Sequence, residues 1–280
     1  MPPLTITPHI DSLIDLALEE DLGSGDVTTQ ALIPSGLEGE AEIRAKQTLV
    51  VAGLPVAARV FEKVEAGLSF TAQVAEGQEV PPGTVLARLA GPVAAILTGE
   101  RVALNFLMRL SGIATFTRKM VAAIAGQPAV LVDTRKTTPC WRVLEKYAVR
   151  LGGGHNHRFG LFDGVLIKNN HLTAVGSIHK AVRLARERAP QPLAIEVEVT
   201  DLAGLEEALA AGADIVMLDN MTEADMAKAA EITRGRALLE ASGSMTLARL
   251  PQVAATGVNF ISMGALTHSA PAVDIHLRLI

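Results

Sequence analysis

The sequence contains very little cysteine and lacks any long apolar run. Its one cysteine, Cys140, excludes an intramolecular disulfide framework and favours a reducing compartment. No run of about 20 apolar residues is present, which excludes a helix that spans a membrane. The first residues, MPPLTITPHID, have neither the basic start nor the apolar core of a secretory signal peptide. These absences predict a soluble, cytoplasmic protein with no membrane partner.

Aromatic residues are also scarce. They make up 3% of a chain in which 49% of the residues are hydrophobic, so Ala, Val, Leu and Ile must fill the core, as they do in α/β proteins. With 280 residues the chain is long enough for a sizeable core and for one or two domains.

Positive charge is concentrated in one segment, residues 133–171. This segment carries seven Lys and Arg residues against three Asp and Glu residues, a net charge of +4, whereas the whole chain has a net charge of −5. A focused positive site in an acidic protein indicates a small anionic ligand and argues against a nucleic-acid surface. We therefore expect a small-molecule site here and no nucleic-acid partner.

Cations of this segment follow apolar runs that have the length of buried strands. Val130–Asp133 leads into Thr134-Arg135-Lys136, and Val165–Ile167 leads into Lys168. Glycine at 152–154 then gives the backbone the freedom to turn residues 155–158 into a pocket.

A helix is predicted between the two cationic clusters. Pro139 can occupy its first turn, and Gly152 can end it. Three cations, Arg142, Lys146 and Arg150, are spaced four residues apart on this helix. We expect them to form a solvated or partner-facing stripe and not a catalytic group.

The N-terminal half has a different pattern. Thr7 and Pro8 predict the start of a helix that Gly23 ends. Short strands punctuated by Gly and Pro follow from residue 41 to residue 97, with a helix at 57–64. Two further helices are predicted, one capped by Thr98 and the next by Ser111 and reaching Ala125.

After Gly126 the chain alternates between strand and helix patterns, which favours a parallel sheet. The predicted strands are 129–133, 165–168, 193–199, 214–218, 237–240 and 259–263, and the helices between them include 175–188, 202–211, 222–233 and 245–255. Polar groups fall at the carboxyl ends of the strands, which form the catalytic face in α/β barrels. They are Thr134, Arg135, Lys136, Lys168, Glu198, Asp219, Ser242–Gly243–Ser244 and Met263–Gly264–Ala265.

Motifs in nearly the whole chain resemble those of one family. They are EDLGSGDVTT, GERVALNFLMRLSGIAT, DTRKTTP, EKYAV, GGGHNHR, LIKNNH, EVEV, MLDN, EASGS and SMGALTHSA. In this order and spacing they resemble quinolinate phosphoribosyltransferase, also called nicotinate-nucleotide pyrophosphorylase (carboxylating). The sequence departs from the common pattern at Cys140-Trp141, where Gly-Leu is usual, and at Asn169, where an acidic residue often stands.

The resemblance implies a fold and an assembly. The fold would be that of a type II phosphoribosyltransferase, with an N-terminal open α/β sandwich domain at 1–112 and an incomplete, seven-stranded α/β barrel at 113–270. Residues 271–280 would pack back on the first domain. The family also implies a homodimer in which Arg101 reaches the neighbouring active site, and it leaves a hexamer open.

The resemblance also implies the substrates, quinolinate and phosphoribosyl pyrophosphate, and a Mg²⁺ ion. The two carboxylates of quinolinate would be bound by Arg101, Arg135, His157 and Arg158. Lys136 and Lys168 would neutralise the leaving pyrophosphate, with Lys168 also close to quinolinate. Glu198 and Asp219 would hold Mg²⁺ or the ribose hydroxyls and favour an oxocarbenium-like transition state. The 5′-phosphate would be bound by backbone amides near helix starts, at Ser242, Gly243 and Ser244 and at Met263, Gly264 and Ala265, beside Thr134.

Other polar residues have structural explanations. We expect Glu196 to form an ion pair within the barrel and His155 and His171 to be structural. His268 fits a core histidine as well as a pyrophosphate contact.

Three alternative functions have to be weighed. Lys168 at a strand end could be the nucleophile of a Schiff-base lyase, although such a lysine needs no dicarboxylate clamp. The chain could be a non-catalytic phosphosugar-binding protein, which the combination of acids and cations disfavours. It could also be a pyrophosphorylase paralogue of the molybdenum-uptake type, and the NHR and IKNNH motifs favour the quinolinate enzyme instead.

Overall fold

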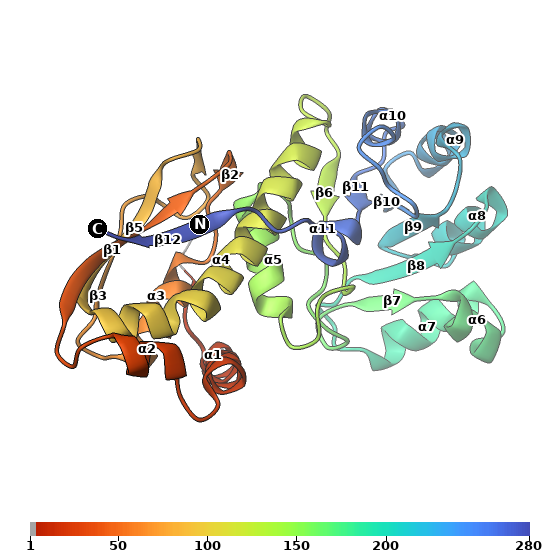
Figure 1. Ribbon diagram of the computed structural model, residues 1–280. Helices are drawn as coiled ribbons and strands as arrows, with labels where there is room; N and C mark the ends of the chain where they lie inside the picture. The colour runs from red at the N-terminus through yellow and green to blue at the C-terminus, as the bar shows by residue number, and fades with distance from the viewer. Residues whose placement is uncertain (1–3) are drawn as a thin grey trace. The chain divides into compact units, whose positions relative to one another are not determined.

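The computed structural model describes residues 4–280, which form two compact units. The first unit reaches to Arg118 and includes Thr138–Gly153 and Ala270–Ile280, and the second consists of Lys119–Thr137 and Gly154–Ser269. Figure 1 shows the elements of both. Among the described residues, none of the helices has the length and apolar character needed to cross a membrane.

The first unit is built on a four-stranded antiparallel sheet in the order β12-β1-β5-β3. Its helix α1 (Pro8–Leu22) begins after the N-cap Thr7 and ends at Gly23, as predicted. The helix expected at 57–64 is also present, as α3. The remaining elements are β1 (Glu38–Ala45), β2 (Leu49–Val50), α2 (Val27–Leu32), α3 (Leu54–Val64), β3 (Ser69–Ala72), β4 (Glu79–Val80), β5 (Val85–Pro92) and β12 (Ile275–Leu279).

One prediction for the first unit is wrong. The helices expected to start at Thr98 and Ser111 are a single helix, α4 (Val93–Ala122). Both hydroxyl groups bond to neighbouring segments and cap no helix: Ser111 donates to Ala52 O at 3.1 Å, and Thr98 donates to Asp26 at 3.4 Å. The predicted domain boundary at residues 112 and 113 therefore lies inside a continuous helix.

Helix α5 (Arg142–Leu151) belongs to the first unit, although its residues were expected in the barrel domain. It begins three residues after Pro139 and is held against α4 by stacking of Trp141 on Phe106, with ring centroids 4.7 Å apart. Lys146 is fully buried, so the predicted stripe of solvated cations is wrong at this position.

The second unit contains a six-stranded parallel sheet in the order β6-β11-β10-β9-β8-β7, which confirms the predicted strands and their direction. An isolated parallel β-bridge joins Val132 of β6 to His155, in place of a full seventh strand. The strand order does not close, so the barrel is incomplete. The strands are β6 (Val130–Val132), β7 (Val165–Ile167), β8 (Ile195–Val199), β9 (Ile215–Asp219), β10 (Leu238–Ser242) and β11 (Phe260–Ser262).

Helices follow the strands with two differences from the predicted pattern. The helix expected at 175–188 is split at Gly176, which has a φ of 104°. The helix expected at 245–255 is reduced to α10. The helices are α6 (Asn169–Val175), α7 (Ile178–Arg188), α8 (Leu202–Ala210), α9 (Glu223–Thr233), α10 (Leu250–Ala254) and α11 (Ala265–His268).

Candidate active site

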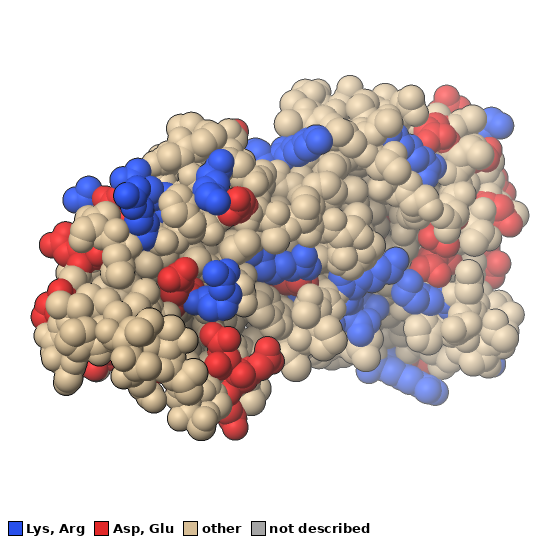
Figure 2. All heavy atoms as spheres, in the orientation of Figure 1, with Lys and Arg blue, Asp and Glu red and all other residues tan. Residues whose placement is uncertain are grey.

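The carboxyl ends of the barrel strands surround two neighbouring cavities in the second unit. Figure 2 shows Lys and Arg side chains gathered on the face of this unit that is in view. The first cavity has a volume of about 310 Å³ and is lined by four cations from three loops, together with one carboxyl group, Glu240. The cations are Arg135, Lys136, Arg158 and Lys168. The size is that of a site for a small molecule.

A buried carboxylate shapes the first cavity. Asp133, at the end of β6, is fully buried and accepts hydrogen bonds from Asn156 Nδ2 at 2.6 Å and from the backbone N–H of His157 at 2.9 Å. The loop that follows Gly154 is therefore fastened to the end of β6. The Arg158 side chain is directed by a second bond, from its guanidinium to the carbonyl of Gly164 at 2.8 Å.

Two of the guanidinium groups in this cavity repel each other. Burial, and then the charge of Arg135, lower the pKa of Arg158 below its ordinary value. The repulsion between two guanidinium groups destabilises the unliganded site. It indicates that the site binds an anion, because a bound carboxylate or phosphate would relieve the repulsion.

The second cavity, of about 620 Å³, shares Lys136 and Lys168 with the first and adds two carboxylates, Glu198 and Asp219. Lys168 Nζ lies 2.6 Å from Glu198 Oε2, so the cation and the acid hold each other at the rim. The cavity is completed by the loops that were expected to bind phosphate, Ser242–Gly243–Ser244 and Met263–Gly264–Ala265, and by His268.

One expectation about these loops is wrong. Residues 242–244 do not lie at a helix start, because α10 begins only at Leu250, whereas Ala265 does begin the short helix α11. The 242–244 loop instead depends on close backbone packing. A Cβ atom at Gly243 would lie 2.1 Å from Asn220 Oδ1, and the residue has a φ of 100°, so only glycine fits here.

The predicted Mg²⁺ ligands fit a hard divalent cation. Glu198 and Asp219 come from neighbouring strands and both line the second cavity. Carboxylate oxygens are the protein ligands that Mg²⁺ prefers, usually one or two of them together with phosphate oxygens and water. The donor set therefore suits a metal ion that also contacts a phosphorylated substrate.

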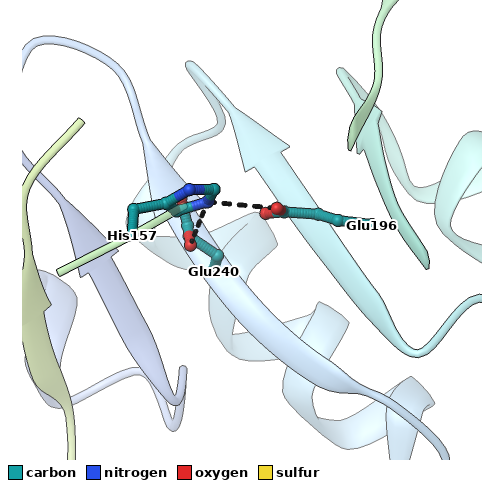
Figure 3. A group of neighbouring side chains, drawn as sticks. All are labelled: His157, Glu196 and Glu240. Carbon is teal, nitrogen blue, oxygen red and sulfur yellow. Dashed lines mark hydrogen bonds and ion pairs between the residues drawn. The ribbon is translucent and has the colours of Figure 1, made fainter. Parts of the chain in front are cut away.

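A third group of side chains lies in the barrel interior (Figure 3). His157 Nε2 is 3.1 Å from Glu196 Oε2 and 3.4 Å from Glu240 Oε2, and both acids are almost fully buried. The structural contact expected for Glu196 within the barrel is thus present, but as a hydrogen bond with His157 and not as the predicted ion pair. The role of Glu240 was not predicted, although it stands two residues before Ser242 on β10, as Glu196 stands two residues before Glu198 on β8.

This trio has the residue types of a metal site, but its hydrogen bonds argue against one. His157 Nδ1 accepts a hydrogen bond from the backbone N–H of Arg158 at 2.8 Å. Nδ1 is then unprotonated, and Nε2 carries the hydrogen of the neutral ring. A nitrogen that donates N–H to carboxylates has no lone pair for a metal ion.

Models of known families match the chain over nearly its full length. The N-terminal domain of quinolinate phosphoribosyl transferase matches residues 26–111, and the C-terminal domain of the same family matches residues 113–278. The chain belongs to the quinolinate phosphoribosyl transferase family.

Individual relatives agree with the family models. A probable carboxylating nicotinate-nucleotide pyrophosphorylase of Synechocystis sp. is 49% identical and covers 99% of this chain and 96% of the relative. The protein of the same description from Bacillus subtilis is 46% identical over 96% of this chain and 93% of the relative. The structure of the nicotinate-nucleotide pyrophosphorylase from Francisella tularensis is 40% identical, with a TM-score of 0.93 over 98% of both chains.

Arg101, which was expected to reach the active site of a neighbouring subunit, does not line the cavities of its own chain. Arg101 is on α4 in the first unit with 57% of its side chain exposed, and residues of the second unit line both cavities. His157 lines the first cavity, but its ring nitrogens already bond within the protein. His171 accepts a hydrogen bond from the N–H of Lys168, which is a structural role, as expected.

Proposed function

We propose that the protein transfers the phosphoribosyl group of phosphoribosyl pyrophosphate to quinolinate and releases CO₂, giving nicotinate mononucleotide and pyrophosphate. The observation that carries this proposal is the pairing of two cavities at the strand ends. One is lined by four cations, and the other combines cations with two carboxylates and two glycine-containing loops. These are the surroundings that a dianionic acid and a metal-bound phosphosugar require.

Quinolinate is assigned to the first cavity. The guanidinium groups of Arg135 and Arg158 can each bind a carboxylate through two parallel hydrogen bonds, which an ammonium group cannot do. Their mutual repulsion favours a ligand with two negative charges over one with a single charge. Arg101, supplied by the second subunit of a homodimer, is the further cation we assign to this site.

Phosphoribosyl pyrophosphate is assigned to the second cavity. The 242–244 and 263–265 loops offer backbone N–H groups to the 5′-phosphate, and Lys136 and Lys168 neutralise the pyrophosphate. Glu198 and Asp219 would hold Mg²⁺ and face the ribose hydroxyls. The metal ion, when bound, supplies positive charge to the departing pyrophosphate.

The residues around the two cavities fit one reaction. The pyridine nitrogen of quinolinate attacks C1 of the ribose as the bond to pyrophosphate breaks, through a transition state with oxocarbenium character. Carboxylates in the second cavity stabilise the positive charge on the sugar, and the lysines stabilise the negative charge on the leaving group. The ring nitrogen is now cationic and accepts the electrons left at C2 when the adjacent carboxylate departs as CO₂.

A reducing compartment suits the single exposed cysteine, so we assign this activity to the cytoplasm.

The lyase alternative is disfavoured by the contacts of its nucleophile. Lys168 is ion-paired to Glu198 at 2.6 Å, and an ammonium group held by a carboxylate is a poor nucleophile.

A coupled assay tests the function. Protein with Mg²⁺, quinolinate and phosphoribosyl pyrophosphate should release pyrophosphate and CO₂ in equal amounts. Nicotinic acid should be turned over at least about 100-fold less efficiently, because its single carboxylate leaves an arginine without a partner. Equal turnover of nicotinic acid, or no turnover of quinolinate, would overturn the assignment, and the second result is what a molybdenum-uptake-type paralogue would give.

A further inference from the structure

Glu240 is an acid in a cavity whose other charged residues are all cations. It lies on β10, is 2% exposed, and lines the first cavity together with Arg135, Arg158 and Lys168. Its Oε2 faces His157 Nε2 at 3.4 Å. Within residues 4–280, its other oxygen, Oε1, is buried and has no hydrogen-bond partner.

The surroundings of Glu240 cannot satisfy two carboxylates. The neutral His157 ring has one N–H, on Nε2, and Glu196 Oε2 is the nearer acceptor at 3.1 Å. Glu196 also has a buried oxygen, Oε1, without a partner among residues 4–280. A pair of buried acids that share a single N–H is stable when one of them carries a proton.

The groups that face Glu240 indicate which acid holds that proton. Burial and the charge of Glu196 on β8 raise the pKa of Glu240 to about 7. His157, Ser262 on β11 and Lys168 after β7 each lower this pKa, but by less. At neutral pH a large fraction of Glu240 is therefore the neutral carboxylic acid. Its hydroxyl group can serve as a donor, which an ionised glutamate in a site for anions could not.

We propose that Glu240 donates a hydrogen bond to a carboxylate of bound quinolinate and then gives its proton to ring carbon C2 when CO₂ leaves. This inference rests on the proposed function and adds the acid that the reaction requires. Loss of CO₂ breaks the bond from C2 to the carboxylate carbon and leaves an electron pair on C2. The proton of Glu240 forms the new C2–H bond, Glu240 becomes a carboxylate, and water restores its proton.

The decisive variant is Glu240→Gln, because an amide keeps a hydrogen-bond donor and has no proton to give. Pyrophosphate reports the first step and CO₂ the second, so we expect pyrophosphate release to persist while CO₂ release falls about 100-fold, the usual range for a general acid. Quinolinate mononucleotide should accumulate. Glu240→Asp, which keeps an acid, should restore part of the CO₂ release.

Glu187→Gln is the control. This exposed acid of the second unit is ion-paired to Arg183 and lines neither cavity, so its variant should release CO₂ and pyrophosphate in equal amounts. The proposal for Glu240 is overturned if Glu240→Gln also keeps that ratio at one, whether both rates are unchanged or both fall together. If the wild-type protein itself releases no pyrophosphate from quinolinate, the proposed function fails instead.

A measurement on the wild-type protein serves if the Glu240→Gln variant does not fold. The kcat/KM for quinolinate, measured by CO₂ release, should fall about tenfold per pH unit above pH 7 as Glu240 ionises. A kcat/KM that stays constant from pH 6.5 to pH 9 would overturn the proposal.

Discussion

Replacement of Arg158 by alanine should separate activity from stability. The side chain lines the first cavity and is held beside Arg135, whose charge helps to lower its pKa. Removing one partner of a hydrogen-bonded charge pair costs roughly 2–5 kcal/mol. Because Arg158 is only partly buried, we expect its removal to cost about 3 kcal/mol of transition-state stabilisation. This corresponds to a loss of about 100-fold in kcat/KM for quinolinate at saturating phosphoribosyl pyrophosphate.

The same replacement should leave the free energy of unfolding within about 1 kcal/mol of the wild type. It removes the hydrogen bond from Arg158 to the carbonyl of Gly164, worth about 1 kcal/mol, but it also removes the repulsion with Arg135. Arg158→Lys should recover only part of the activity, because a point charge cannot form the two-bond fork. Arg150→Ala, an exposed cation of the first unit, is the control. The reasoning is refuted if Arg158→Ala lies within threefold of the wild type, or if Arg150→Ala loses as much.

Three further predictions concern assembly, backbone strain and pH. Mixing the inactive variants Arg101→Ala and Arg158→Ala should restore up to about a quarter of wild-type activity through hybrid dimers with one intact shared site; no recovery in any mixture would exclude a site shared between subunits. Cys140 has a φ of 65°, in the left-handed region, so Cys140→Gly should leave stability unchanged or raise it by up to about 1 kcal/mol in urea unfolding, and a clear loss would contradict this. The folded protein binds the Glu240 proton more tightly than the unfolded chain does, since burial raises this pKa from 4.5 to about 7. The free energy of unfolding of the wild type should therefore fall relative to that of Glu240→Gln between pH 4.5 and 7, by up to roughly 3 kcal/mol, and a constant difference between the two would refute the raised pKa.

The sequence was most informative where a local pattern decides the structure. Thr7, Pro8 and Gly23 bound α1 because caps act within one turn of the helix. The strands of the barrel were located because buried parallel strands are short apolar runs between helices. Polar residues after those runs gather at the cavities because parallel strands all end at the same mouth.

The sequence was less informative where distant segments decide. Ser111 has the residue type of a helix cap, but Ala52, 59 positions away, takes its hydrogen bonds. Lys146 has the spacing of a surface cation, yet packing in the first unit buries it. Glu240 was missed because only the folded barrel brings it to His157 and Glu196. The usual Gly at position 140 in the family has a local explanation in the positive φ of Cys140, which no composition could indicate.

The pairing of β12 with β1 has a consequence for synthesis of the protein. Residues 275–279 form an edge of the sheet that begins at Glu38, so the first unit cannot be completed until more than 230 residues after β1 have left the ribosome. The unpaired edge of β1 stays open to other chains throughout that interval. The second unit draws only on residues 119–137 and 154–269, so it can fold while the first still waits for its last strand.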